Sequence, residues 1–226
     1  HDLRQPLQAI SLLVEVLRER LVGRDVSGLV DKVQASVHAL ESLFVSLLDI
    51  SRLDAGAIQP HVQKLSVASV LRLIEANFLP QALAKGLRLE VVHSSAVVLS
   101  DPALLERILS NLVSNAVRYT ASGRVLVGCR RRKDRLQILV IDTGPGIPPP
   151  FQGEIFEEFF QIGNPERDRS KGLGIGLAIV RRTAALLARP LALRSTLGVG
   201  SVFSIDVPLA RTSVLPPIAR APDEAE

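Results

Sequence analysis

A histidine at the first position, and a set of asparagine, aspartate and glycine residues more than a hundred positions later, are the residues best suited to chemistry. Asp2 directly follows His1, and its carboxylate can accept a hydrogen bond from one imidazole nitrogen. That bond selects the tautomer and makes the other ring nitrogen more nucleophilic. The later residues are of the types that bind phosphate groups, a hard cation and a flat ring.

The histidine opens an amphipathic helix expected over residues 1–22. Its apolar residues follow one another at alternating steps of four and three, which makes a heptad seam: Leu3, Leu7, Ile10, Val14, Leu17 and Leu21. On this seam His1, Asp2 and Gln5 fall on the outer face, so we expect His1 to face solvent. Pro6 removes one backbone hydrogen bond and is expected to bend the helix. From this segment alone, an ordinary surface histidine explains the pattern equally well.

A second heptad seam follows a break at residues 23–28. Its members are Val26, Val30, Val33, Val37, Leu40, Phe44 and Leu47. Two such helices joined by a short turn form a helical hairpin. One hairpin cannot cover both apolar stripes, so a second copy is predicted to complete a four-helix bundle. The sequence therefore predicts a homodimer.

The periodicity changes after the LDAG motif at residues 53–56. Strands are then expected at 58–65, 87–93, 97–99, 124–131, 136–141, 191–195 and 202–208, and helices at 66–85, 102–119 and 173–187. Asp101 followed by Pro102 is a good helix start, with Asp as the N-cap. The predicted class is α+β, with a hairpin over 1–56, a mixed domain over 57–210 and a disordered Pro- and Ala-rich tail over 211–226.

The predicted helix after Asp101 places Asn111, Asn115 and Arg118 on one face, with Tyr119 adjacent. Two carboxamides can hold a hydrated Mg²⁺ ion and contact phosphate oxygens, because Mg²⁺ prefers hard oxygen ligands. Arg118 can offset phosphate charge. An ordinary polar helix face is the alternative.

Asp142 follows the apolar strand LQILVI and can accept a hydrogen bond from an exocyclic amine. Gly144 and Gly146, two and four positions later, would let the backbone approach a flat ring closely. An ordinary loop with two glycines would look the same.

Gly172, Gly174 and Gly176 lie where a loop enters a helix, and the backbone amides of a helix start suit phosphate groups. About 25 residues separate them from the first glycine pair and contain the FEEFFQ segment with Phe156, Phe159 and Phe160. A loop of this length is typical of a mobile lid over a ligand. The alternative is that the phenylalanines belong to the core.

Composition limits the remaining classes. The net charge of +4 comes from 22 arginines among 27 basic residues, but these are scattered apart from one run of three, and aromatics make up 4% of the chain. This argues against nucleic acid as a partner.

The single cysteine, Cys129, excludes internal disulfides, favours a cytoplasmic location and is expected to be an inert packing residue. No apolar run is long enough to span a membrane, so no membrane contact is expected from this fragment. The abrupt start within a helical pattern indicates a longer parent protein, whose membrane anchoring stays open.

Together these residues resemble the catalytic half of a bacterial sensor histidine kinase from two-component signalling. HDLRQP resembles the phosphoacceptor box, NLVSNAVRYT the N box, and DTGPGI and GLGIGLAIV the two glycine boxes. FEEFF resembles the F box between them, and LGVGSVFSIDVP the closing segment of the ATPase domain. The resemblance implies a dimeric hairpin followed by an α/β sandwich of the Bergerat type, shared with gyrase and Hsp90.

The resemblance also implies a role for each matching residue. His1 would accept the γ-phosphoryl group of ATP, with Asp2 as its acid–base partner, and would pass it to an aspartate on a response-regulator receiver domain. Asn115 would coordinate Mg²⁺ and Asn111 would lie near the phosphates. The remaining roles fall to nucleotide-contacting residues: Arg118 and Tyr119 on phosphate and ribose or base, Asp142 on the adenine amine, Gly144 and Gly146 beside the base, and Gly172, Gly174 and Gly176 at the lid and phosphates.

One position departs from the common pattern. Gln5 stands where many relatives have Thr or Asn, which positions water for removing the phosphoryl group from the partner, so phosphatase activity is in doubt. Two alternatives stay open. The chain could be a dimerisation scaffold that binds ATP without transferring it, or a topoisomerase, chaperone or mismatch-repair ATPase of the same sandwich. The double heptad seam in front of the sandwich argues against the latter.

Overall fold

The computed structural model describes residues 10, 14–15, 27–163 and 174–210. Four of the predicted site residues, His1, Asp2, Gln5 and Gly172, lie outside these described residues, as does the predicted tail at 211–226. The described elements form a long helix followed by an α/β sandwich, which agrees with the predicted class.

The helix α2 (Ser27–Asp54) contains the described part of the second seam and ends at the LDAG motif, as predicted. Val30 and Val37 are buried, whereas the alternate seam positions Val33 and Leu40 are 43% and 49% exposed. The short described pieces of the preceding segment behave alike, with Val14 buried and Ile10 44% exposed. Among the described seam residues, Val14, Val30 and Val37 are therefore covered, whereas Ile10, Val33 and Leu40 remain in contact with solvent.

Two sheets follow α2. The smaller pairs β1 (Gln63–Ser66) with β3 (Val97–Ser100) in antiparallel fashion. The larger has the order β2-β4-β5-β7-β6, in which only β2 and β4 are parallel. Its strands are β2 (Arg88–Val91), β4 (Arg124–Arg132), β5 (Arg135–Asp142), β6 (Leu191–Thr196) and β7 (Gly200–Pro208).

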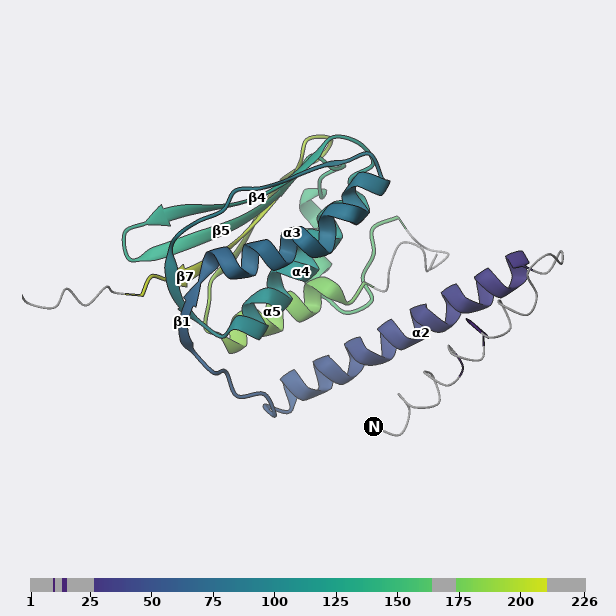
Figure 1. Cartoon of the computed structure of the whole chain (residues 1–226), viewed down its shortest axis with the longest axis horizontal. Helices are drawn as coiled ribbons and strands as arrows, with labels where there is room; N and C mark the ends of the chain where they lie inside the picture. The colour runs from purple at the N-terminus through teal and green to yellow at the C-terminus, as the bar shows by residue number, and fades with distance from the viewer. Residues whose placement is uncertain (1–9, 11–13, 16–26, 164–173, 211–226) are drawn as a thin grey trace, which may run out of the picture.

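Three helices cover one face of the larger sheet, and α2 lies outside them (Figure 1). They are α3 (Val67–Ala84), α4 (Pro102–Tyr119) and α5 (Gly176–Leu186). The core between helices and sheet consists mainly of aliphatic side chains, and α4 contributes eight buried residues from one face. Cys129 packs at the edge of this core, and burial raises the pKa of its thiol to about 11, which agrees with an inert packing role.

The predicted hairpin around Lys133 and Asp134 is confirmed, with Arg132 opposite Arg135 in the register. Two other boundaries were wrong. The strand expected at 58–65 begins only at Gln63, because Pro60 has no N–H to donate and the partner strand β3 has four residues. The helix expected from residue 173 begins at Gly176, because Gly174 has a φ of +71° that no α-helix accommodates.

The loop between β5 and α5 has more structure than the sequence predicts. It contains two short 3₁₀ helices, Pro149–Phe151 and Glu154–Phe156. Phe156 and Phe160 are half-buried against the core, and Phe160 lies 5.8 Å from Phe151 between ring centroids. The core explanation is therefore right for these two rings, whereas Phe159 is 52% exposed.

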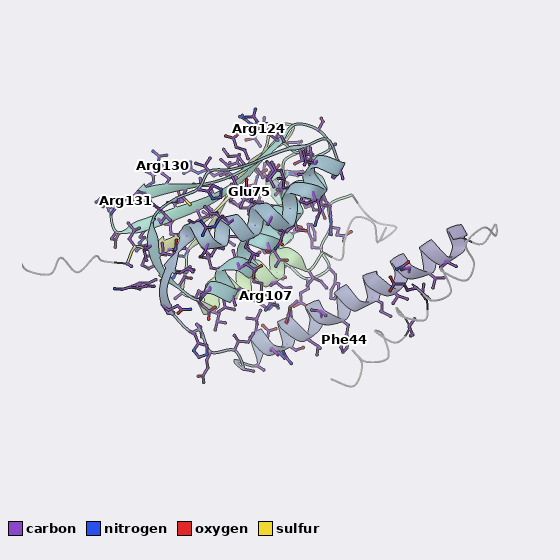
Figure 2. All side chains as sticks on the ribbon, in the orientation of Figure 1. Phe44, Glu75, Arg107, Arg124, Arg130 and Arg131 are labelled. Carbon is purple, nitrogen blue, oxygen red and sulfur yellow. The ribbon has the colours of Figure 1, made fainter. Side chains whose placement is uncertain are left out.

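The last two turns of α2 dock onto the sandwich. Ile50 packs with Ile175 and Ile179 of the α5 region. Asp49 forms an ion pair with Arg107, a residue of α4 whose side chain lies on the side of α2 (Figure 2). Arg182 on α5 donates from Nε to Asp54 at 2.8 Å and from Nη2 to Glu158 at 2.5 Å. One guanidinium thus connects the end of α2 with the phenylalanine-rich segment.

In the part of the chain that the structure describes, every helix is too short or too polar to cross a bilayer.

Substitution of the N-cap residue Asp101 tests how much the cap of α4 contributes to the stability of the fold. Asp101 is 7% exposed, accepts a hydrogen bond from Leu104 N at 3.0 Å, and accepts a second from His61 N at 2.8 Å. Asp101→Ala should lower the free energy of unfolding by about 1–2 kcal/mol, because the cap and a buried acceptor are lost together. Urea denaturation measures the change. Asp134→Ala, in an exposed turn, should change stability by less than about 0.5 kcal/mol, and an equal loss in both variants would contradict the assignment.

Candidate functional site

The carboxylate of Asp142 stands at the end of β5, where the sandwich opens. Its Oδ1 accepts hydrogen bonds from Gly144 N at 2.9 Å and from Ser201 N at 3.3 Å. Burial raises the pKa of Asp142 above its ordinary value of 3.8, and the two backbone donors oppose that shift. No described residue forms a salt bridge with it. Within the described residues, Asp142 is therefore a half-buried acceptor that is held in place by backbone donors.

The glycines after Asp142 are required by close packing. A Cβ at Gly144 would lie 2.9 Å from Asp142 Oδ1, and one at Gly146 would lie 2.1 Å from the carbonyl oxygen of Thr196. Gly146 also has a φ of +70°, in the left-handed region that other residues rarely adopt. The first glycine turn thus brings backbone close to the Asp142 carboxylate and leaves no side chain over it.

Thr120 is a polar residue of this site that the sequence interpretation did not single out. It is buried, its Oγ1 has no hydrogen-bond partner among the described residues, and it would lie 3.3 Å from a Cβ at Gly144. An unsatisfied buried hydroxyl is costly and calls for a partner such as water or ligand. Ser201, which donates its N–H to Asp142, was also missed, because its role depends on the pairing of β7 with β5.

The carboxamides of Asn111 and Asn115 lie where α5 begins. Asn111 Nδ2 donates to the carbonyl of Arg107 at 2.9 Å, which leaves its Oδ1 directed to the other side. A Cβ at Gly176 would lie 3.0 Å from Asn111 Oδ1 and 3.7 Å from Asn115 Nδ2. The two amides and the first residue of α5 are therefore brought together, as the predicted shared face of α4 requires.

Gly174 connects the second glycine turn with the phenylalanine-rich segment. Its carbonyl accepts a hydrogen bond from Phe159 N at 3.0 Å, and a Cβ there would lie 2.8 Å from the carbonyl oxygen of Phe160. The second glycine turn and the phenylalanine-rich segment therefore lie in direct backbone contact.

Arg118 and Tyr119, at the last turn of α4, are both exposed on the side of the site. The end of α4 is held by Lys85, whose Nζ donates to the carbonyl oxygens of Val117, Arg118 and Thr120 at 2.7, 2.8 and 3.2 Å. A cation on terminal helix carbonyls is a favourable arrangement. The sequence interpretation missed Lys85, since its partners lie more than thirty residues away.

The donor set limits which metal could bind. Among the described residues, no three His, Cys, Asp or Glu side chains form a cluster that could hold a metal ion. The oxygens near the start of α5 are amide oxygens of Asn111 and Asn115. Hard, neutral oxygens fit a Mg²⁺ ion that keeps water and phosphate ligands, and they do not fit a transition-metal site.

These features line one side of α4. The Asp142 turn and Thr120 lie at its C-terminal end, and the two amides lie one to two turns earlier against the start of α5. The arrangement provides an acceptor for an amine at one end, and amides and a helix N-terminus suited to anionic oxygens at the other. Of the predicted ligand-binding residues, all but Gly172 fall within described segments that line this side.

Comparisons with known families match both parts of the chain. Residues 1–56 match the model of the His Kinase A (phospho-acceptor) domain. Residues 100–211 match the model described as histidine kinase-, DNA gyrase B-, and HSP90-like ATPase. The two models together match most of the chain, and the second includes all the site features just described except Lys85.

Curated relatives are sensor histidine kinases. The chain is 32% identical over 212 residues to sensor histidine kinase RcsC of Escherichia coli K12, a match that covers 92% of this chain and 22% of that protein. It is 32% identical over 213 residues to sensor-like histidine kinase SenX3 of Mycolicibacterium smegmatis, covering 92% of this chain and 55% of that one. The chain therefore spans between about a fifth and about half of these relatives.

Solved structures agree with the fold. Full-length ShkA in complex with AMPPNP superimposes with a TM-score of 0.79 at 30% identity, covering 94% of this chain and 45% of that one. The histidine kinase AdeS of Acinetobacter baumannii has a TM-score of 0.69 at 20% identity, which supports the fold alone. The chain belongs to the histidine kinase family, with a phospho-acceptor domain followed by an ATPase domain of the type shared with DNA gyrase B and HSP90.

Proposed function

We propose that this chain transfers the γ-phosphoryl group of ATP to His1 and then to an aspartate on the receiver domain of a response regulator. The observation that carries the proposal is the alignment along α4 of an amine acceptor, an amide pair and a helix N-terminus, in a chain that begins with a phospho-acceptor match. The relative ShkA, which is described with AMPPNP bound, supports ATP as the nucleotide.

In this proposal Asp142 recognises adenine. Its carboxylate accepts a hydrogen bond from the exocyclic amine, while Gly144 and Gly146 bring backbone against the face of the ring. The two backbone donors to Oδ1 leave Oδ2 available for the base. Thr120 supplies a hydroxyl next to the same turn and can bind the base directly or through water.

The phosphate end falls to Asn111, Asn115, Arg118 and the second glycine turn. Asn115 would hold Mg²⁺ through its amide oxygen, and the ion would neutralise charge on the phosphate oxygens. Asn111 would contact the phosphates, and Gly172, Gly174 and Gly176 would provide backbone amides at the start of α5. Arg118 would contact a phosphate and Tyr119 the ribose or base from the open edge.

The transfer step is an in-line displacement. A ring nitrogen of His1 forms a bond to the γ-phosphorus, the bond from that phosphorus to its bridging oxygen breaks, and ADP leaves with the electron pair. Asp2 holds the other ring nitrogen and stabilises the cationic ring. Catalysis rests on positioning and charge neutralisation rather than on a covalent intermediate in the nucleotide site.

We further propose that residues 1–56 form the dimerisation and phospho-acceptor domain and residues 57–210 the ATP-binding domain. The exposed seam residues Ile10, Val33 and Leu40 support a homodimer, because a second hairpin could cover them. An ATP-binding scaffold without transfer activity is the competing function, and the first experiment below distinguishes the two.

Incubation with γ-labelled ATP and Mg²⁺ should attach label to the chain in a form that is lost in acid and stable in base. His1→Gln should abolish the label, because no acceptor nitrogen remains, whereas the exposed His61→Gln should keep it. A parent chain that retains ATP but takes up no label, even when extended upstream, would favour the scaffold.

Asp142→Asn should weaken ATP binding about 10- to 100-fold, because a charged acceptor for the amine becomes a neutral one. Burial raises the pKa of Asp142 from 3.8, so this carboxylate is protonated at a higher pH than an ordinary aspartate. Affinity of the parent should therefore fall as the pH is lowered through that raised pKa. Isothermal titration calorimetry across pH 4 to 7 measures this. If Asp142→Asn shows the same fall, the titrating group is not Asp142.

Gly176→Ala should reduce affinity for Mg·ATP about tenfold and leave stability unchanged or slightly higher. A methyl group there would press on Asn111 Oδ1 at 3.0 Å, while alanine suits a helix better than glycine. Gly153→Ala is the matched control, since nothing lies within 4 Å of a Cβ at that position. Titration of a fluorescent ATP analogue, together with thermal unfolding, separates the two effects; equal affinities in both variants would count against the phosphate role of this turn.

A further inference from the structure

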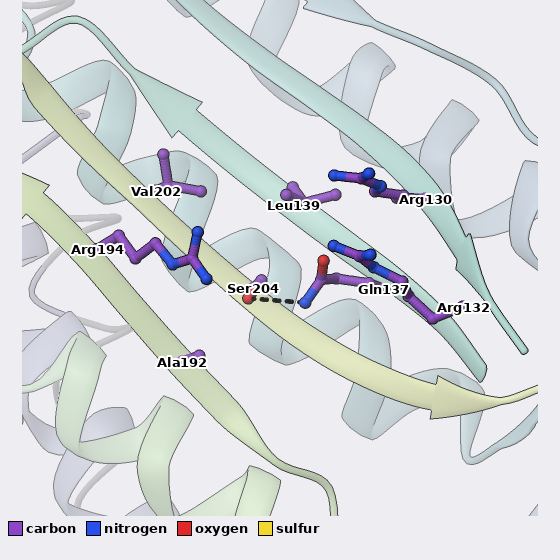
Figure 3. Close-up of a pocket in the computed structure, with 8 residues that line it drawn as sticks. All are labelled: Arg130, Arg132, Gln137, Leu139, Ala192, Arg194, Val202 and Ser204. Carbon is purple, nitrogen blue, oxygen red and sulfur yellow. Dashed lines mark hydrogen bonds between the residues drawn. The ribbon is translucent and has the colours of Figure 1, made fainter.

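The face of the larger sheet opposite its helices carries a shallow hollow lined with arginines. The hollow has a volume of about 150 Å³. It is lined by Arg130, Arg132, Gln137, Leu139, Ala192, Arg194, Val202 and Ser204 (Figure 3). It forms because Gly128, Leu139, Ser204 and Ala192 stand opposite one another in the register, so small side chains lie across three of the four strands.

The lining is cationic. Arg130 and Arg132 come from β4, Arg194 comes from β6, and none of the three forms a salt bridge with a described residue. The lining includes no carboxylate, and Gln137 Nε2 donates to Ser204 Oγ at 3.5 Å across its floor. Asp206, opposite Gln137 on β7, is the nearest acidic position in the register. Three guanidinium groups with free donors are suited to carboxylate or phosphate.

The floor narrows the choice of ligand. Leu139 and Val202 make it partly apolar, and the lining has no aromatic side chain on which a base could stack. None of the residues that line the hollow is a large exposed hydrophobic residue of the kind that inserts into a membrane, which argues against a lipid surface as the partner. A hollow of this size accepts a few side-chain atoms, so acidic side chains of a polypeptide fit it better than a nucleotide.

The segment 211–226 has the required composition and is attached next to the hollow. Its acidic residues Asp223, Glu224 and Glu226 lie within its last four positions, and Arg211, Arg220 and the apolar residues at 214–218 precede them. It continues from β7, where Leu209 N bonds to Asp134 O at 2.9 Å, at the end of the sheet where Arg132 stands opposite Arg135. Sixteen extended residues reach about 50 Å, and a nine-residue strand measures about 30 Å, so the acidic residues can reach the hollow.

We propose that the acidic residues of segment 211–226 bind in the arginine-lined hollow on the open face of the sheet. Covalent attachment makes the local concentration of the segment high, on the order of millimolar, so weak ion pairs are sufficient for binding. The inference is independent of the proposed kinase function, since the hollow lies on the face opposite α4 and the nucleotide site.

Trypsin provides a native reporter, because Arg220 lies three residues before Asp223. The initial rate of cleavage after Arg220 is measured on the full chain by mass spectrometry and divided by the rate on a free peptide of residues 211–226. We expect the ratio to rise at least threefold in Arg130→Ala/Arg194→Ala, and also in Asp223→Asn/Glu224→Gln/Glu226→Gln, normalised to its own peptide. Sodium chloride at 1 M should raise the parent to the same level.

Arg131→Ala is the matched control. It removes the same charge from the neighbouring position, which stands opposite the buried Leu136 on the other face of β4 and is not part of the hollow. Its cleavage ratio should equal that of the parent, and unchanged thermal unfolding verifies that each variant is folded. Equal ratios in all variants would overturn the proposal. So would an effect of the arginine variants without an effect of the acidic ones, because the hollow would then act on a different partner.

Discussion

Close backbone approach at the end of β5 is the constraint on which the site depends. A Cβ at Gly200 would lie 2.0 Å from the carbonyl oxygen of Asp142, and one at Gly146 would lie 2.1 Å from that of Thr196. Both glycines have positive φ values, so side chains are excluded by strain and by space. This packing fixes the direction of the Asp142 side chain and brings the ends of β5, β6 and β7 into close contact. The carboxylate is then held by two N–H donors and forms no salt bridge with a described residue, which suits it to accept a hydrogen bond from a neutral amine.

The helix α4 packs on the core with one face and presents the polar side chains of the site on its edge. Its eight buried residues anchor one face, Asp101 caps its start and Lys85 holds its last carbonyls. Because both ends are fixed, the polar edge with Asn111 and Asn115 is presented to α5 at a defined distance. The same helix also contacts α2 through Arg107, whose carbonyl accepts from Asn111 and whose side chain pairs with Asp49. Docking of α2 and the position of the amides therefore share one residue.

Arg182 makes a second connection of this kind. It pairs with Asp54 at the end of α2 and with Glu158 in the phenylalanine-rich segment, which in turn is bonded to Gly174. Ion pairs of this exposure contribute little to stability singly. Their value is geometric, since the end of the hairpin helix and the second glycine turn are held through a common group.

Local spacing in the sequence was enough to predict the Asp101 cap, the α4 face with Asn111 and Asn115, and the β4–β5 hairpin, because each depends on neighbours within a few residues. The heptad steps likewise predicted the α2 seam. Spacing did not predict the roles of four other residues, namely Thr120, Lys85, Ser201 and Arg182. The groups next to them come from strands and helices that are distant in the chain, so these roles exist only once those elements have packed together. The arginine-lined hollow is of the same kind: its small residues Gly128, Ser204 and Ala192 come from three strands and are aligned by the sheet register. Spacing along the chain determines which face a residue occupies, and only packing between elements decides what that face meets.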